Sequence, residues 1–204
     1  MIEPPPLTYE RDLWRNGFRY VGGIDEAGRG AWAGPVAAAV VVFPAEAGIR
    51  RPLACVRDSK LMTPLQRERA APIIKAEALA WAVGFSSSEE IDLLGILPAT
   101  RQAIMRALEM LPLPPEYLLL DYIHWPALSK PHLALPKGER KSLSIAAASV
   151  LAKTTRDALM REMDDQYSGY GFARHKGYGT LQHRTALSRQ GPCAIHRMSF
   201  AIHG

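Results

Sequence analysis

The chain has 204 residues, of which 48% are hydrophobic and 22% are charged. This composition is typical of a soluble globular protein with one domain of ordinary size, and it excludes a largely disordered chain. No run of about 18 apolar residues is present to span a membrane, and the proline-rich, acidic N-terminus does not resemble a secretion signal. Cys55 and Cys193 show neither a disulfide framework nor metal-ligand spacing. We therefore expect a cytoplasmic protein.

The net charge of +5 comes from the C-terminal end of the chain. Residues 166–204 contain no Asp or Glu, and their cations are Arg174, Lys176, Arg184, Arg189 and Arg197. Histidines and aromatic residues lie among these cations: His175, His183, His196, His203, Tyr167, Tyr170, Phe172 and Tyr178. A basic segment with interleaved aromatics is typical of a surface that binds a polyanion. A solvated basic surface without a ligand explains the same pattern equally well.

The pattern of apolar residues predicts strands that alternate with helices along the chain. The expected strands are 20–25, 35–43, 80–85 and 117–121, with a further one at 132–136. The expected helices are 64–79, 96–110, 142–167 and 180–189. Thr63-Pro64 and Ser142 or Ser144 are typical helix starts. This order predicts an α/β fold without repeats or a second domain.

Two of the apolar segments end in acids. Asp25 and Glu26 follow YVGGI, and Asp121 follows YLLL. A carboxylate at the end of a buried strand is costly unless a partner such as a divalent cation compensates its charge. Two such ions about 4 Å apart can activate a water molecule and stabilise the leaving oxygen of a phosphodiester. An acid after a strand is more often a helix cap or turn former, so the spacing alone leaves both interpretations open.

A further candidate, Asp157, lies in the long alanine-rich helix. Helical spacing places it on or beside the buried stripe, where it could face the strand ends. The same spacing suits an ion pair with Lys153, four residues earlier, or with Arg161, four residues later. By spacing alone, the ion pair is the favoured interpretation.

Asp25 and Glu26 are subject to a geometric constraint. Adjacent residues on a strand point to opposite faces, so their side chains cannot both reach one metal while the strand runs straight. Gly28 and Gly30 follow at once and allow the backbone to turn. We therefore rank Asp25 above Glu26 as a bridging ligand.

Six segments, in order, resemble the signatures of bacterial ribonuclease HII. They are GIDEAGRG at 23–30, AGPVAAAVVV at 33–42, DSK at 58–60, SIAAASVLAKTTRD at 144–157, YGFARHKGYGT at 170–180 and GPCAIHRMSF at 191–200. The resemblance implies a ribonuclease H-like fold, with a mixed five-stranded sheet flanked by helices and a small C-terminal helical part from about 166 to 204. Residues 1–19 would be an N-terminal extension, and residues 20–204 the catalytic domain.

The resemblance also implies an activity. It implies an endoribonuclease that cleaves the RNA strand of RNA–DNA hybrids and nicks 5′ of single ribonucleotides in duplex DNA, leaving 3′-hydroxyl and 5′-phosphate ends. Such an enzyme would serve ribonucleotide excision repair and RNA primer removal, as a monomer. Mg²⁺ or Mn²⁺ in a two-metal site would be the cofactor. Its metal-binding, catalytic acids would be Asp25, Glu26, Asp121 and Asp157, the last matching the aspartate of the family's TRD segment.

The same resemblance implies substrate contacts. Gly28, Arg29 and Gly30 match the family's GRG loop, which lies against the backbone around the ribonucleotide; glycine allows such close approach, and the 2′-hydroxyl distinguishes RNA from DNA. Tyr178 matches a tyrosine expected to stack on the sugar of the following deoxynucleotide. Lys60 and Lys176 would contact phosphates.

Some positions depart from the family pattern. Tyr122 follows the strand-end aspartate where glycine is usual, Glu139 replaces an aspartate, and Ala31-Trp32 replaces proline and leucine. Two alternatives remain: a ribonuclease HIII-like hybrid nuclease, and a non-catalytic nucleic-acid-binding module. The first has lysine where this chain has Arg29, together with an additional N-terminal domain. The second is disfavoured because all the acids are present.

Overall fold

The computed structural model describes residues 3–201, apart from the side chain of Ala47. At its centre is a five-stranded mixed sheet in the order β3-β2-β1-β4-β5. The strands are β1 (Val21–Ala27), β2 (Val36–Val42), β3 (Ala80–Ser86), β4 (Tyr117–Asp121) and β5 (His132–Leu135). The first three strands pair antiparallel, whereas β4 is parallel to both β1 and β5. The predicted α/β class and mixed five-stranded sheet are confirmed.

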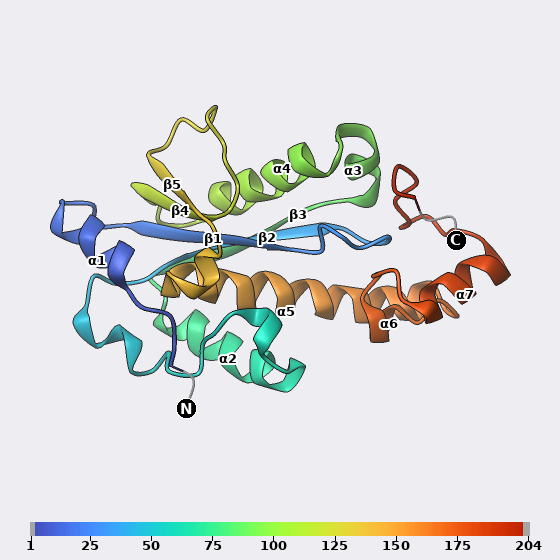
Figure 1. Ribbon diagram of the computed structural model, residues 1–204, viewed down its shortest axis with the longest axis horizontal. Helices are drawn as coiled ribbons and strands as arrows, with labels where there is room; N and C mark the ends of the chain where they lie inside the picture. The colour runs from blue at the N-terminus through green and yellow to red at the C-terminus, as the bar shows by residue number, and fades with distance from the viewer. Residues whose placement is uncertain (1–2, 202–204) are drawn as a thin grey trace.

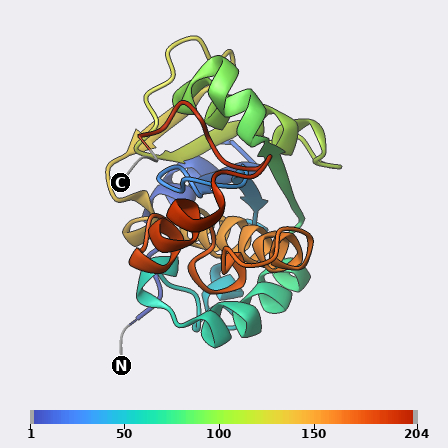
Figure 2. The ribbon, with the colours of Figure 1, turned by 90° about the vertical axis from the view of Figure 1, so that its right-hand side faces the viewer.

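Helices cover both faces of this sheet. The helices of the described residues are α1 (Thr8–Arg15), α2 (Pro64–Glu77), α3 (Ser88–Leu94), α4 (Ile96–Glu109), α5 (Leu143–Gln166), α6 (Phe172–His175) and α7 (Leu181–Gln190). Short 3₁₀ turns are η1 (Ala47–Arg50), η2 (Ser59–Leu61) and η3 (Gly138–Arg140). In Figure 1, α3 and α4 lie on one side of the sheet, and α2 and α5 lie on the other. The turned view in Figure 2 shows the same layers.

The two helical layers explain the composition of the central strands. Every residue of β2, VAAAVVV, is buried, as expected for a strand that is covered on both faces. Ala39 and Val41 pack in the core under α5, while Ala38, Val40 and Val42 pack in the core under α4. The site therefore rests on a sheet whose centre is inaccessible to solvent.

Helix α5 is the longest element and begins at a densely bonded N-terminus. The Ser142 hydroxyl accepts a hydrogen bond from the Ile145 N–H, as predicted for an N-cap. The buried carboxylate of Glu10, in α1, accepts hydrogen bonds from both serine hydroxyls, of Ser142 and Ser144, and from the Ser144 N–H. The N-terminal segment thus fixes one end of α5, and α6 and α7 lie at its other end (Figure 1).

None of the helices in the described part of the chain is long and apolar enough to cross a membrane.

Candidate active site

Three of the predicted acids meet at one edge of the sheet. Strands β1 and β4 are parallel neighbours, and Ile24 is paired with Leu120. The next residue on each strand is an acid, so Asp25 and Asp121 lie side by side. The pKa of Asp25 is raised well above its usual value by burial, by the Glu26 charge and by the Asp121 charge. A hydrogen bond with the Ser149 hydroxyl opposes this rise.

Asp25 and Glu26 are neighbours on β1, where the strand periodicity predicts that their side chains point to opposite faces. Asp25 faces α5, where Ser149 lies, and the Ser149 hydroxyl is 2.8 Å from that of Ser59 in the DSK segment. Glu26 Oε1 accepts a hydrogen bond from Arg29 Nη1 at 3.0 Å. Burial raises the pKa of Glu26, and Arg29 opposes that shift. Its second oxygen, Oε2, is buried and has no hydrogen-bond partner within the described residues.

The fourth acid at this edge is Glu139, which the sequence reasoning did not select. Asp121 Oδ1 accepts a hydrogen bond from the Gly138 N–H at 2.7 Å, and this places the neighbouring Glu139 beside Asp121. The pKa of Glu139 is raised by burial and by the charges of Asp121 and Asp58. Its Oε2 is also buried without a partner in the described region. The sequence did contain a signal for Glu139, because this residue stands where the family that the chain resembles has an aspartate.

The structure does not bring Asp157 to the other acids. Asp157 Oδ1 is 2.7 Å from Lys153 Nζ, and Asp157 Oδ2 is 3.5 Å from Arg67 Nη2. It lies eight residues beyond Ser149 on α5, a distance of about 12 Å along the helix axis. The helical stripe predicted its burial correctly, but the period does not tell how far along the helix a residue meets the sheet. The ion pair with Lys153, which the spacing favoured, is the one that forms.

A groove of about 560 Å³ lies next to the acids. Five of the six residues predicted to bind substrate line it: Gly28, Arg29, Gly30, Lys60 and Tyr178. The groove is also lined by Glu26, Ser149, Lys153, Ile96 and Phe200. Acidic, cationic and aromatic side chains therefore line the same groove.

Lys176 lies outside this groove. It lines a neighbouring cavity of about 240 Å³ together with Lys153, Asp157 and Tyr178. Its ammonium donates a hydrogen bond to the Ala173 carbonyl, and burial lowers its pKa. Tyr178 lines both cavities, so its ring stands at the boundary between the groove and Lys176.

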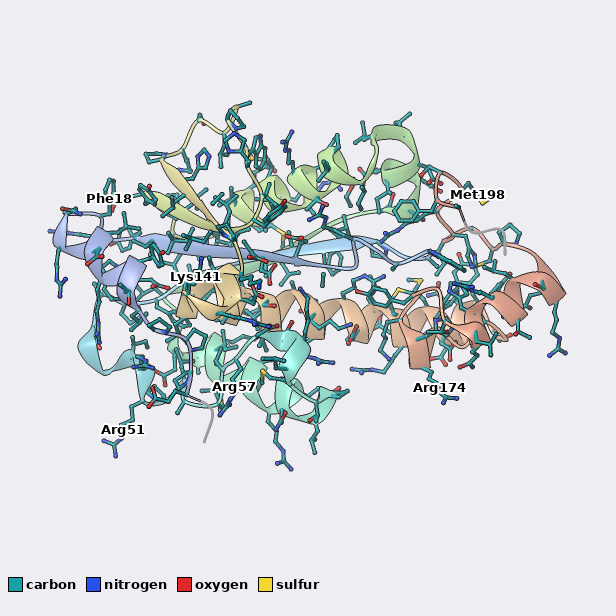
Figure 3. The ribbon with its side chains drawn as sticks, viewed as in Figure 1. Phe18, Arg51, Arg57, Lys141, Arg174 and Met198 are labelled. Carbon is teal, nitrogen blue, oxygen red and sulfur yellow. The ribbon has the colours of Figure 1, made fainter. Side chains whose placement is uncertain are left out.

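The basic C-terminal segment divides into surface and core. Arg174, Arg184 and Arg189 are exposed, and Arg174 extends outward from α6 in Figure 3, on the opposite side of the C-terminal part from Met198. Arg197, in contrast, is fully buried. His175, His183 and His196 are buried as well, so they do not face a polyanion. His203 lies outside the described residues.

Tyr122 has a backbone conformation that explains one departure from the family pattern. Its φ is 55°, in the left-handed region, and its side chain is exposed. Glycine adopts this conformation without the steric cost that a tyrosine incurs. The substitution therefore strains the turn after Asp121 without removing a ligand.

The acids have the chemistry of a site for a hard divalent cation. All of their donors are carboxylate oxygens, which Mg²⁺ and Mn²⁺ prefer. The raised pKa values of Asp25, Glu26 and Glu139 and the unpartnered oxygens of Glu26 and Glu139 indicate negative charge that a cation would neutralise. Within residues 3–201, no group of three or more His, Cys, Asp or Glu side chains stands in an arrangement that could hold a metal ion by itself. An open edge of this kind suits an ion that keeps several waters and also binds substrate phosphate.

Comparison with known proteins gives one consistent result. A family model described as Ribonuclease HII matches residues 22–203. The chain is 50% identical over 198 residues to Ribonuclease HII of Chloroflexus aurantiacus, with 96% of this chain and 93% of that protein aligned. It is 51% identical over 192 residues to Ribonuclease HII of Thermus thermophilus, with 94% and 91% aligned. The crystal structure of ribonuclease H2 from Pyrococcus horikoshii superposes with a TM-score of 0.74 at 25% identity, over 90% of this chain and 94% of that one.

Proposed function

The chain belongs to the ribonuclease HII family and is therefore a ribonuclease H, a metal-dependent endonuclease that acts on RNA–DNA substrates; we propose that it also nicks duplex DNA 5′ of a single embedded ribonucleotide, leaving 3′-hydroxyl and 5′-phosphate ends. One observation carries this proposal. The Gly28–Gly30 loop and Tyr178 line the same groove as Glu26. The loop that we propose to contact the ribose and the ring that we propose to stack on the next sugar thus line one groove with Glu26.

The acids would hold the catalytic cations. Asp25, with Glu26 and Asp121 as its charged neighbours, would be the central ligand, and Glu139 would complete the set in place of Asp157. Two bound Mg²⁺ or Mn²⁺ ions would supply an activated water and stabilisation of the leaving oxygen. Asp157 would instead hold Lys153 and Arg67 by its two ion pairs.

The groove residues would position the substrate. The backbone of Gly28, Arg29 and Gly30 would approach the ribonucleotide closely and contact its 2′-hydroxyl. The Tyr178 ring would stack on the following deoxyribose, where a 2′-hydroxyl would be crowded. Lys60, which is exposed at the groove, and Lys176, in the adjoining cavity, would contact phosphates.

The proposal is tested with a labelled DNA duplex that carries one internal ribonucleotide, incubated in Mg²⁺, Mn²⁺ or EDTA. We expect a metal-dependent nick on the 5′ side of the ribonucleotide. Cleavage of long hybrids without this nick would favour the ribonuclease HIII-like alternative. Cleavage of neither substrate would favour a nucleic-acid-binding module.

The proposed substrates also indicate a cellular role. A chain that removes ribonucleotides and RNA primers from DNA would work in the cytoplasm of a bacterium, on the chromosome. We propose that it acts as a monomer, since one chain supplies both the acids and the groove. Analytical ultracentrifugation with and without a nicked duplex would test this, and a dimer as the active species would contradict it.

A further inference from the structure

Two arginines are buried in the wall behind the groove. Arg156, in α5, and Arg197, after α7, each have 0% exposure. Neither forms an ion pair with an Asp or Glu in the described part of the chain. Burial lowers the pKa of both, that of Arg197 to about 9. A buried and unpaired charge is costly, so hydrogen bonds to its neighbours must compensate it.

Those hydrogen bonds all go to backbone carbonyls. Arg156 donates from Nε to Pro35 at 2.8 Å, from Nη2 to Ala33 at 3.1 Å and from Nη1 to Lys176 at 2.9 Å. Arg197 donates from Nε and Nη2 to Gly34 at 3.0 and 2.8 Å, and from Nη1 to Arg29 at 2.9 Å. The two guanidinium groups therefore hold residues 29–35, which follow directly on the Gly28 turn.

Arg156 joins this loop to the segment that carries Tyr178. Its Nη1 binds the carbonyl of Lys176, two residues before Tyr178, and its guanidinium carbon is 5.6 Å from the Tyr178 ring centroid. Gly28, with φ of 93°, lies directly on the guanidinium: a Cβ there would be 2.0 Å from Arg156 Nε. The Gly177 carbonyl also accepts a hydrogen bond from the Trp32 N–H at 2.8 Å. The Arg156 guanidinium thus contacts both walls of the groove, namely the loop after Gly28 and the segment that carries Tyr178.

We infer that Arg156 and Arg197 are positioning residues that fix the spacing between the Gly28–Gly30 backbone and the Tyr178 ring, and so determine selectivity for a single ribonucleotide in duplex DNA. This inference rests on the proposed function. A duplex with an isolated ribonucleotide can bind in one position only, with its ribose at the Gly28–Gly30 backbone and the next deoxyribose at the Tyr178 ring. A long hybrid offers many equivalent phosphodiesters and no junction to read, so its cleavage depends less on this spacing.

Lysine is the informative replacement. It keeps the positive charge, but a single ammonium cannot reproduce the planar array of a guanidinium that reaches three carbonyls. In Arg156→Lys we expect kcat/KM on the single-ribonucleotide duplex to fall by about 10- to 100-fold, the scale of a small misalignment of reacting groups. On a long hybrid we expect it to stay within about threefold of wild type. The ratio of the two values is the readout, because a loss of folded enzyme lowers both equally.

Arg106→Lys is the matched control. Arg106 also donates to a backbone carbonyl, that of Phe85, and binds Glu90, but it lies on α4, on the other face of the sheet from α5. This variant should leave the substrate ratio unchanged. Arg197→Lys is the second variant, and it decides the matter if circular dichroism shows that Arg156→Lys does not fold. In a Tyr178→Ala background the Arg156→Lys effect on the ratio should disappear, because there is no ring left to position.

The outcomes separate the inference from the proposed function. If wild type cuts hybrids but not the single-ribonucleotide duplex, the proposed function fails and the inference fails with it. If wild type cuts both, an unchanged substrate ratio in a folded Arg156→Lys or Arg197→Lys variant overturns the inference alone. A selective loss on the single-ribonucleotide duplex that depends on Tyr178 supports it.

Discussion

Asp25 is the residue to which we assign the central role in the proposed metal site. It is buried, and its pKa is raised by the charges of Glu26 on the same strand and of Asp121 on the neighbouring strand. Ser149, from α5, reaches it from a third element. A carboxylate with acidic neighbours on both sides is the natural central ligand for cations.

Replacing Asp25 tests this role directly. In Asp25→Asn the side chain keeps its shape but loses its charge, so we expect cleavage to fall by about 1,000-fold or more, corresponding to about 4 kcal/mol of transition-state stabilisation. Hybrid binding, measured by electrophoretic mobility shift, should remain within a few fold. Unchanged cleavage would remove the metal assignment.

Glu139 and Asp157 are the two candidates for the fourth metal-binding acid. Because Glu139 adjoins Asp121 while Asp157 is paired with Lys153, we expect Glu139→Gln to raise the Mg²⁺ concentration needed for half-maximal cleavage by about tenfold. Asp157→Asn should leave that concentration unchanged, and Glu139→Asp should retain most activity. The opposite ranking in a metal titration would return Asp157 to the ligand set.

At the residue scale, strand-end acids were predictable and loop acids were not. Asp25 and Asp121 each end an apolar run, and parallel neighbours bring such ends together. Glu139 lies in η3, a turn without periodicity, where only its occurrence in place of a family aspartate marked it. Asp157 was selected because it matches the aspartate of the family's TRD segment, whereas its helical spacing had favoured the ion pair with Lys153, which the structure contains.

At the scale of elements, long periodic segments were predicted well. Strands β1 to β5 and helices α2, α4, α5 and α7 all lie within a few residues of their expected bounds. Helices α1, α3 and α6 were missed. α6 has only four residues, too few for a helical period. α3 begins with a capping box between Ser87 and Glu90, a local signal that was overlooked.

The missed helix α1 makes a testable contribution to α5. Glu10 is 1% exposed, and its Oε1 accepts three hydrogen bonds from Ser142 and Ser144. We expect Glu10→Ala to lower the free energy of unfolding by about 2–4 kcal/mol, since it leaves buried donors unpaired at a helix N-terminus. Urea denaturation measures this. Glu109→Ala, at an exposed position of α4, is the control, and an equal effect of both variants would contradict the capping role.

At the scale of the whole molecule, a histidine cluster joins the C-terminal elements. His183 Nε2 is 3.0 Å from His196 Nε2, and the rings of His175 and His183 stack at 4.5 Å. Burial lowers the pKa of all three, that of His183 to about 4. The cluster therefore holds α6, α7 and the last loop together in the uncharged state.

This cluster predicts a loss of stability in acid. The folded state binds fewer protons at His183 than the unfolded state, so the stabilisation is complete above pH 6.5 and is lost as pH falls toward 4. We expect a contribution of at most about 3 kcal/mol. Thermal melts from pH 7.5 to 4.5 should show a smaller fall in Tm for His183→Gln than for wild type. Parallel pH profiles of the two proteins would exclude the cluster as the cause.

The length of helix α5 limits which insertions the chain can tolerate. Ser149 contacts Asp25, and Arg156, seven residues later, contacts both walls of the groove. About 10 Å of rigid helix therefore separates the proposed metal-binding acids from the proposed substrate-positioning walls. A single inserted residue between them would turn every later side chain by about 100°. We therefore expect random insertion libraries to recover active clones with length changes at 122–131, the irregular connection between β4 and β5, but none at 149–156. In the proposed function, the length of this helical segment would set the position of the cut relative to the ribonucleotide.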